Sequence, residues 1–162
     1  MFDRIEYKRR GEKTSINMHS DNLEKFPQFM KKHFHDNNIT FPEATRWSYN
    51  PISAYRAIKY EEGKTEISEE DFRSKAEETL NKSIRGRGAA EPAWNNPAFY
   101  GVSLFENKEK LVNLFKLPRP SKRLAHGLVV SEVGPIYIKE EHITWWLYDG
   151  SFELIRNTFK IE

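Results

Sequence analysis

Apolar residues follow two different spacings along this chain, and the change of spacing separates helical from extended segments. In the first part they recur every three or four positions, at Leu23, Phe26, Met30 and Phe34. This spacing predicts a helix over residues 21–36. Pro27 interrupts the pattern, so the helix either begins with Pro27 in its first turn or bends there. Residues 1–19 alternate weakly and are expected to form an edge hairpin or a partly ordered arm.

Two more helices are predicted in the middle of the chain. Ser68 is a favourable N-cap, and the acidic residues after it suit the first turn of a helix that runs to about Ser83. Its apolar stripe is expected in the core and consists of Phe72, Ala76 and Leu80. A third helix opens at Glu106 or Asn107, ends before Pro118, and is expected to bury Leu111, Val112, Leu114 and Phe115.

The last third of the chain has the short apolar segments and turn residues that are typical of strands. We expect strands at residues 126–132, 136–139, 142–148 and 152–161, arranged as a meander. Strands at residues 55–60 and 101–105 would join them. The pattern therefore predicts one α+β domain over residues 1–162, with an antiparallel or mixed sheet and two or three packed helices.

The composition favours a folded protein and gives no sign of a membrane helix or of disulfide bonds. Aromatic residues make up 14% of the chain, which favours a folded protein over a disordered one. No apolar segment has the length of a membrane helix, and the first residues lack the apolar region of a secretory signal. There is no cysteine, which excludes disulfides, thiolate metal sites and cysteine nucleophiles. A cytoplasmic protein without a membrane partner is the expectation.

Charge is distributed unevenly although the net charge is only +2. Residues 61–78 carry a net charge of −5, and residues 85–126 carry +5. The two segments are either solvated faces of opposite sign or, for the basic one, a rim that suits a phosphate-bearing ligand or a nucleic acid. The basic side chains expected to face a nucleic acid are Arg85, Arg87, Arg119, Lys122 and Arg123.

The connection at residues 85–101 is a long segment without a predicted helix and ends where a short strand is predicted. It is rich in glycine and proline and also carries arginine, tryptophan and tyrosine. Compact domains rarely keep such a long loop unless it binds a ligand, forms a lid or is disordered. We expect this loop to border the functional site.

Arg56 is the most informative charged residue because it lies inside an apolar strand. A buried guanidinium needs either a carboxylate, such as Glu132 or Glu141, or an anionic ligand such as a diphosphate. Ser103 follows Gly101 at a place where the backbone can approach a ligand. For Arg56, a carboxylate partner would indicate a structural role and an anionic ligand a functional one. Ser103 is likewise either an ordinary strand serine or part of a binding site. The sequence leaves these alternatives open.

Histidines and tryptophans supply further candidates. His126 and His142 are either satisfied structural groups or metal ligands together with Glu132 or Glu140, and we expect no metal. Adjacent tryptophans in the strand HITWWLY point to opposite faces of the sheet. One of them is expected in the core, and the other either lines a pocket or caps the sheet.

The order of three motifs is similar to that of the mono-ADP-ribosyltransferase and RES-type toxin superfamily. They are Arg56 in YRAI, Ser103 in FYGVSLF, and the acidic pair in YIKEEHITWW, within roughly residues 55–148. The usual Ser-Thr-Ser is Gly-Val-Ser here, and the acids are adjacent rather than spaced. The resemblance implies that Arg56 grips NAD, that Ser103 shapes the nicotinamide pocket, and that a glutamate stabilises the ribosyl cation. The alternatives for that glutamate are Glu132, Glu140 and Glu141, and residues expected to contact NAD are Tyr100, Trp145 and His142.

Three functional hypotheses follow. The first is a small NAD-using transferase or NAD hydrolase, such as a toxin or phage-defence effector. The second is a non-catalytic interaction protein, such as an immunity protein, an antitoxin or a phage accessory factor. The third is a nuclease or nucleic-acid binder that uses the basic side chains with His126 or His142. No phosphate loop, Rossmann glycine motif or zinc-protease motif is present.

Overall fold

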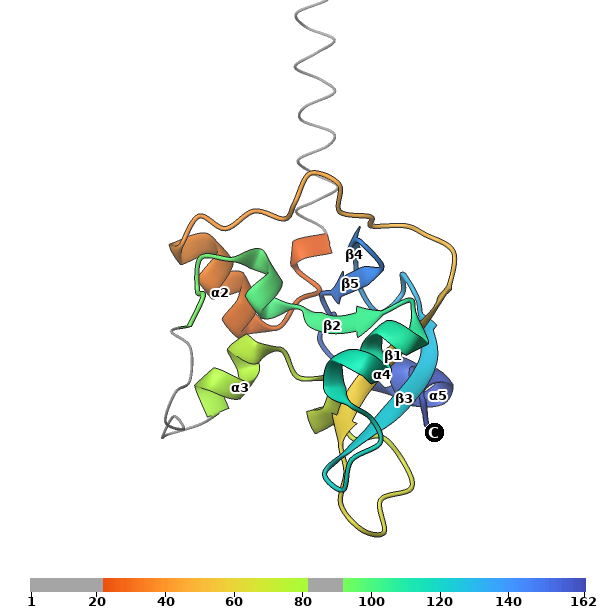
Figure 1. Ribbon diagram of the computed structural model, residues 1–162. Helices are drawn as coiled ribbons and strands as arrows, with labels where there is room; N and C mark the ends of the chain where they lie inside the picture. The colour runs from red at the N-terminus through yellow and green to blue at the C-terminus, as the bar shows by residue number, and fades with distance from the viewer. Residues whose placement is uncertain (1–21, 82–91) are drawn as a thin grey trace, which may run out of the picture.

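The computed structural model describes residues 22–81 and 92–162, which form a sheet with helices packed on both faces (Figure 1). The six strands are β1 (Ile52–Lys59), β2 (Val102–Phe105), β3 (Lys122–Val129), β4 (Ile136–Lys139), β5 (His142–Trp145) and β6 (Lys160–Ile161). The described α-helices are α2 (Gln28–Asp36), α3 (Lys75–Asn81), α4 (Lys108–Phe115) and α5 (Phe152–Thr158). Two 3₁₀ helices, η1 (Glu69–Phe72) and η2 (Pro97–Tyr100), complete the set. The predicted α+β fold is confirmed, and every strand pair is antiparallel.

The strands lie in the order β4-β5-β2-β1-β3-β6. Strand β1 pairs with β3 along its whole length, from Ile52 opposite Val129 to Lys59 opposite Lys122. In contrast, β1 and β2 are paired only where Tyr55 lies opposite Phe105. Beyond that pair the two central strands diverge, and a gap opens between them toward Lys59. This gap determines where the candidate site lies.

Side chains on the two faces of the sheet form three apolar clusters. On the α5 face, residues such as Ala54, Leu104 and Trp145 pack against Ile155 of α5. The opposite α4 face carries two separate clusters. One lies under α4 and contains Phe105, Leu111 and Leu124, and the other lies against α2 and contains Phe26, Met30, Phe34, Tyr100 and Trp146. The two adjacent tryptophans thus point to opposite faces, as predicted, and both are fully buried.

The predicted helix over residues 68–83 is wrong as a continuous element. The structure has η1, then an extended Arg73 with ψ of 140°, and then α3. Ser74 restarts the helix, because its Oγ accepts from the Glu77 amide at 3.2 Å while Glu77 Oε1 accepts from the Ser74 amide at 3.4 Å. Ser68 and Asp71 form a similar capping box at the start of η1, so two separate helical segments replace the single predicted one. Leu80 is 48% exposed rather than in the core, and residues 82–83 lie outside the described part.

The predicted C-terminal meander is also wrong. Strands β1 and β2 are inserted between β5 and β3, so only β4 and β5 form a simple hairpin. The expected strand over residues 152–161 is α5 followed by the two-residue strand β6. Ile155 and Phe159, four positions apart, are both buried, which requires the helical spacing. Strand β3 begins four residues before the predicted position, and β5 ends three residues before it.

The remaining predicted elements have a mixed outcome. Helix α2 starts directly after Pro27, seven residues later than predicted. Pro27 is its N-cap residue with a ψ of 147°, so this proline neither bends the helix nor lies inside its first turn. Asn107 caps α4 by accepting from the Lys110 amide at 3.2 Å, but Leu114 is 63% exposed rather than buried. The arm at residues 1–19 lies outside the described residues. Within those residues no helix is both long and apolar enough to cross a membrane.

Candidate functional site

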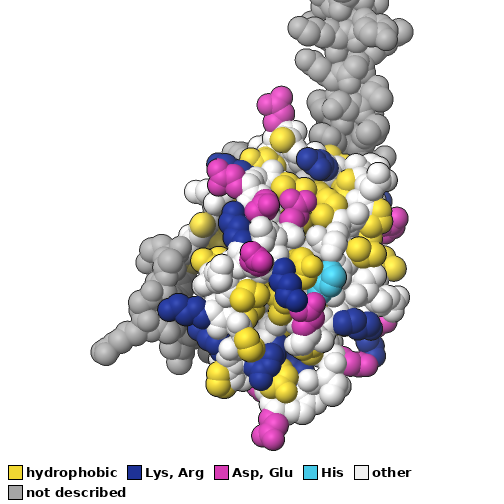
Figure 2. All heavy atoms as spheres, turned by 45° about the vertical axis from the view of Figure 1, so that its right-hand side comes forward, with side chains coloured by type: hydrophobic (Ala, Val, Ile, Leu, Met, Phe, Trp, Pro, Cys, Tyr) yellow, Lys and Arg dark blue, Asp and Glu magenta, His cyan; other side chains and the backbone are white. Residues whose placement is uncertain are grey.

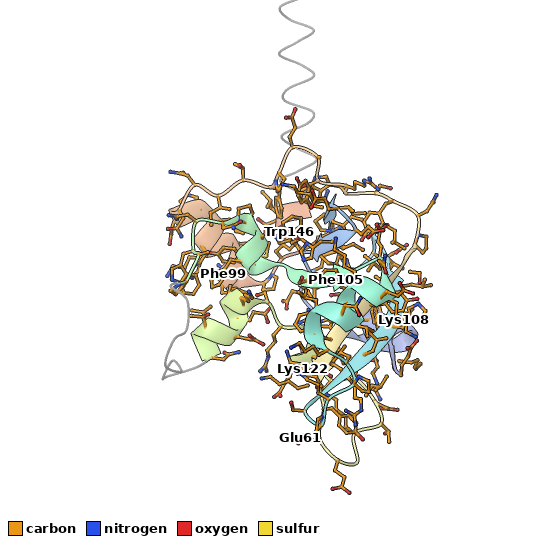
Figure 3. The ribbon with its side chains drawn as sticks, in the orientation of Figure 1. Glu61, Phe99, Phe105, Lys108, Lys122 and Trp146 are labelled. Atoms are coloured by element: carbon orange, nitrogen blue, oxygen red, sulfur yellow. The ribbon has the colours of Figure 1, made fainter. Side chains whose placement is uncertain are left out.

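A polar strip crosses the α4 face between its two apolar clusters. Ser103 on β2 lies opposite Thr144 on β5, and His142 lies opposite Phe105 two positions along the ladder. Successive side chains of a strand alternate between faces, so Ser103, His142 and Thr144 share one face. They form part of the lining of a pocket of about 540 Å³, which we call the Arg56 pocket. Phe99 of η2 and Lys122 at the start of β3 also line it, and Figure 3 labels both.

Arg56 bridges the gap between the diverging strands. Its Nε donates to the carbonyl oxygen of Asp71 at 2.6 Å, and its Nη1 donates to the carbonyl oxygen of Ser103 at 2.7 Å. Its guanidinium also lies over the Phe72 ring, 5.5 Å from the centroid. The Ser103 carbonyl faces the gap where no ladder bond to β1 is available, so Arg56 satisfies an acceptor that the sheet leaves unpaired.

Neither predicted carboxylate partner of Arg56 is in place. In the described part of the chain no ion pair joins Arg56 to Glu132, Glu141 or any other acid, and its hydrogen bonds go to backbone carbonyls. Burial lowers the pKa of Arg56 to about 10, while Glu78 and Asp71 act in the opposite direction. The side chain is therefore charged at neutral pH, and that charge is not cancelled by a direct ion pair.

Asp71 is held in place by its own partners. Lys64 Nζ lies 2.7 Å from the Asp71 carboxylate, and the Ser68 amide donates to Asp71 Oδ2 at 2.8 Å. The Asp71 side chain is 3% exposed, so this ion pair is almost fully buried. It fixes η1, whose last residues present the carbonyl that Arg56 binds.

The segment from residue 92 to Gly101 forms a second wall of the pocket. Trp146 Nε1 donates to the Pro97 carbonyl at 2.8 Å, and Tyr100 OH donates to the Trp94 carbonyl at 2.8 Å. A Cβ on Gly101 would lie 2.4 Å from Thr144 Cγ2, so glycine is needed at this position to leave room for the Thr144 side chain. The loop predicted to border the site does so through residues 93–101, while its part up to residue 91, including Arg85 and Arg87, lies outside the described residues.

Ser103 and His142 are in direct contact, with a short hydrogen bond between Ser103 Oγ and His142 Nε2. The imidazole packs edge-on against Phe105, at a centroid distance of 5.1 Å. Burial, and secondarily the nearby Lys110 charge, lowers the pKa of His142. The ring is consequently neutral at pH 7, and a neutral imidazole can accept a proton from a hydroxyl group.

The pocket has more cationic than acidic side chains among its described lining residues. The cationic ones are Arg56, Lys59, Arg73, Lys75 and Lys122, and the acidic ones are Glu70, Asp71 and Glu78. Two of the acids have cationic partners, because Asp71 pairs with Lys64 and Glu70 lies 3.8 Å from Arg73. The remaining charge favours an anionic ligand.

The other residues proposed from the sequence lie elsewhere. Glu140 and Glu141 form the tight turn between β4 and β5, with φ of 52° and 66°, and both side chains are exposed outside the pocket lining. Glu132 is exposed after β3. Trp145 is fully buried on the α5 face, and Tyr100 is 3% exposed in the cluster against α2. The structure thus brings Arg56, Ser103 and His142 together, but not these five residues.

The described basic residues proposed to bind nucleic acid surround the start of β3. Arg123 lies over the Tyr60 ring at 4.1 Å, and Lys122 lies over the Phe115 ring at 4.8 Å. Figure 2 shows Lys and Arg side chains interspersed with Asp and Glu on the face toward the viewer. Both signs of charge are therefore mixed on that face, and nucleic-acid binding stays a prediction.

The two strand histidines are too far apart in the sheet to share a ligand. His126 lies on β3 and His142 on β5, with β1 and β2 between them. His126 Nε2 contacts Ser53 Oγ at 2.7 Å, and the ring stacks on Tyr55 at 4.4 Å. No group of three metal-ligating side chains occurs in residues 22–81 and 92–162.

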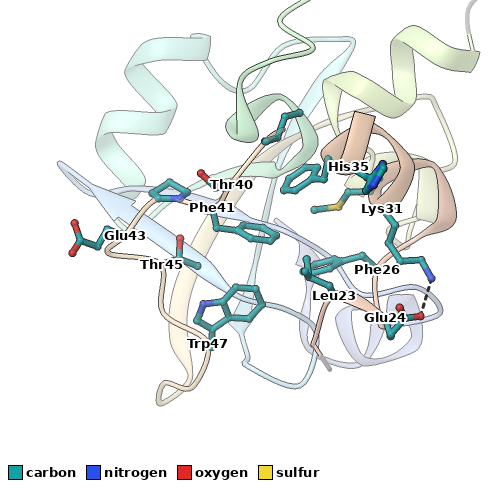
Figure 4. Close-up of a pocket in the computed structure, with 14 residues that line it drawn as sticks. Leu23, Glu24, Phe26, Lys31, His35, Thr40, Phe41, Glu43, Thr45 and Trp47 are labelled. Carbon is teal, nitrogen blue, oxygen red and sulfur yellow. Dashed lines mark hydrogen bonds and ion pairs between the residues drawn. The ribbon is translucent and has the colours of Figure 1, made fainter. Parts of the chain in front are cut away.

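A second cavity, of about 660 Å³, lies between α2 and residues 39–47 (Figure 4). Its lining is mostly aromatic and aliphatic, and includes Phe26, Phe34, Phe41 and Trp47. Thr45 Oγ1 is buried without a hydrogen-bond partner. The described lining residues of this second cavity include no serine–histidine pair like Ser103 and His142, so the Arg56 pocket is the stronger candidate.

Sequence reasoning missed several members of the Arg56 pocket. Glu78 and Phe99 carry no local signal, because each enters the site only through the packing of α3 and η2. The contact between Ser103 and His142 joins positions 39 residues apart. Only the pairing of β2 with β5 brings these two residues together, and that pairing could not be read from the sequence.

Comparison with known proteins gives no relative from which a function can be transferred. No protein-family model, no curated protein and no solved structure matches this chain.

Proposed function

We propose that the protein binds NAD in the Arg56 pocket and cleaves the bond between nicotinamide and ribose, releasing ADP-ribose or transferring it to an acceptor. The observation that carries this proposal is the convergence of Arg56 and Ser103. The two residues are 47 positions apart and lie on different strands, yet they are in direct contact and line one pocket. They are the residues for which the family resemblance implies NAD binding.

The charge of the pocket supports a diphosphate ligand. Two of the N–H donors of Arg56 bind carbonyl groups, and a guanidinium has five such donors. Lys122 and Lys75 line the same pocket. Guanidinium and ammonium groups together are the usual partners of phosphate oxygens in proteins.

The size and apolar flanks of the pocket also suit a dinucleotide. Its volume of about 540 Å³ lies within the range of small-molecule and cofactor sites. Phe99 and Phe115 line it from different elements and provide aromatic surface for planar rings. Asn96 adds a polar group at the edge.

The proposal does not assign the ribosyl cation to Glu132, Glu140 or Glu141, because none of them lines the pocket. Glu78 of α3 is a partly buried carboxylate that does. Among the described lining acids, Asp71 pairs with Lys64 and Glu70 pairs with Arg73, which leaves Glu78 as the candidate. We assign to Glu78 the stabilisation of the positive charge that develops on the sugar.

Stabilisation of the folded protein by NAD tests the binding step. At a concentration of 100 times the dissociation constant, NAD should add about 2.7 kcal/mol to the free energy of unfolding. Lys122→Ala should weaken this effect and Lys139→Ala should not, because Lys139 is an exposed lysine on β4 outside the pocket. Arg56 is a poor test residue here because it also holds the fold together.

Release of nicotinamide, followed by chromatography, tests the chemical step. NAD that neither stabilises the protein at millimolar concentration nor yields nicotinamide would refute the proposal. Stabilisation by NAD without nicotinamide release would mean that the protein binds NAD but does not cleave it.

A further inference from the structure

Two serine–histidine contacts lie on the α4 face of the sheet, and they differ in their surroundings. Ser53 Oγ is 2.7 Å from His126 Nε2, on the β1–β3 side, and neither residue lines the Arg56 pocket. Ser103 and His142 both line that pocket. The sheet therefore offers a serine–histidine pair inside a cationic cavity and a similar pair outside it.

His142 is held so that its Nε2 faces the serine. Its backbone pairs with Phe105, and its ring packs against the Phe105 side chain. Because the ring is partly buried and stays neutral at pH 7, its Nε2 can accept the proton of Ser103. A serine hydroxyl is a weak nucleophile until such a base is within hydrogen-bond distance.

Ser103 is also fixed from its other side. Arg56 binds the Ser103 carbonyl at 2.7 Å, so the backbone of the serine cannot move away from the guanidinium. The serine side chain is itself exposed to the pocket. Because Arg56 and Ser103 line the same pocket, a phosphate-bearing ligand held by Arg56 would share the cavity with this hydroxyl.

We propose that Ser103 is a nucleophile, that His142 is its general base, and that the pocket forms a covalent ADP-ribosyl intermediate on Ser103. This inference rests on the proposed cleavage of NAD. It accounts for the position of the three predicted glutamates outside the pocket, because covalent capture divides one difficult step into two easier ones.

The reaction has two steps. In the first, a bond forms between Ser103 Oγ and the ribose C1′, the bond from C1′ to the nicotinamide nitrogen breaks with its electron pair going to nicotinamide, and the serine proton moves to His142 Nε2. In the second, water attacks C1′, the C1′–Oγ bond breaks, and His142 returns its proton to Ser103 Oγ. The proton of the attacking water leaves to solvent, so NAD and water yield ADP-ribose, nicotinamide and one proton.

Labelling by a fluorophosphonate probe tests the nucleophile without using NAD. The full-length chain is treated with the probe, and the modified peptide is identified by mass spectrometry. We expect modification at Ser103 that is absent in Ser103→Ala, is slowed about 100-fold in His142→Asn, and is unchanged in Ser53→Ala. Absence of labelling, or equal labelling of Ser53, would overturn the inference.

Acid quenching during NAD turnover then tests the intermediate. We expect the Ser103 peptide to carry the mass of one ADP-ribosyl group in wild type and in Ser53→Ala. If Ser103→Ala releases nicotinamide at the wild-type rate, the covalent route is wrong and NAD cleavage stands. If the probe labels Ser103 but no nicotinamide is released, NAD cleavage is wrong and the nucleophile–base pair stands.

Discussion

Removal of the Arg56 guanidinium should destabilise the protein even when no ligand is present. Arg56→Met keeps an apolar stem against Phe72 but removes both hydrogen bonds to the carbonyls of Asp71 and Ser103. Hydrogen bonds that involve a charged group contribute about 1.5–3 kcal/mol each. Burial of the guanidinium offsets part of this, as its lowered pKa indicates. We expect a net loss of about 2–3 kcal/mol in the free energy of unfolding.

The assay is urea unfolding followed by tryptophan fluorescence at pH 7. With a slope of about 2 kcal/mol per molar urea, this loss lowers the midpoint by about 1–1.5 M. Arg56→Lys should fall between wild type and Arg56→Met, because an ammonium at the end of the stem can reach one carbonyl but not both. The slope itself should stay constant.

Arg123→Met provides the matched control. Arg123 also lies over an aromatic ring and also donates to carbonyl groups, including that of Lys122 at 3.1 Å. It lies at the half-buried start of β3, outside the gap between β1 and β2, so its loss should cost less than about 1 kcal/mol. Equal stability of Arg56→Met and wild type would refute the reasoning, because it would mean that the gap closes without the guanidinium.

Three further outcomes follow from the geometry. Lys64→Met removes the partner of the buried Asp71 carboxylate and should cost about 2–4 kcal/mol by urea unfolding, whereas a loss below about 0.5 kcal/mol would show that the ion pair is dispensable. Glu140 and Glu141 both have positive φ, which is unfavourable for a glutamate. Replacing Glu140 by Asn together with Glu141 by Gly supplies the residues that tolerate positive φ in a two-residue hairpin turn and should raise the melting temperature, whereas a lowered melting temperature would contradict this explanation. The pKa of His142 is lower in the folded protein than the ordinary 6.5, so on acidification the unfolded chain binds a proton first. The contribution of His142 to the free energy of unfolding should therefore be complete above pH 6.5 and decrease below it. The decrease should be smaller in His142→Asn, and equal pH profiles of stability for the two proteins would contradict the lowered pKa.

Local patterns in the sequence predicted most elements but not their neighbours in space. Helix α2 and strand β4 follow from apolar spacing and turn residues alone. Residues 152–161 show how the same reasoning fails, because Leu154 suggests alternation although it is 44% exposed, while the buried Ile155 and Phe159 carry the helical spacing. Sequence alone gave no means of choosing which of these apolar residues is buried.

The order of strands depends on pairings between distant segments, which no local pattern encodes. The meander was the simplest arrangement of the C-terminal strands, but β1 pairs with β3 along its whole length and thereby separates β3 from β5. The candidate site was hard to predict for the same reason, because its residues come from strands that are distant in the sequence. Arg56 was identified from its unusual place in an apolar strand, whereas His142 became a candidate base only once β5 was placed beside β2.

Arg56 connects the architecture of the sheet to the chemistry proposed for it. The divergence of β1 and β2 leaves the Ser103 carbonyl without a partner on β1, and Arg56 supplies the missing donor. An apolar residue at position 56 would leave that carbonyl unsatisfied, and an acidic one would repel it. Carbonyl groups carry only partial charge, so they hold the guanidinium in place without neutralising it. The same residue that bridges the gap therefore presents a positive charge to the pocket that Ser103 and His142 also line, and this charge favours an anionic ligand there.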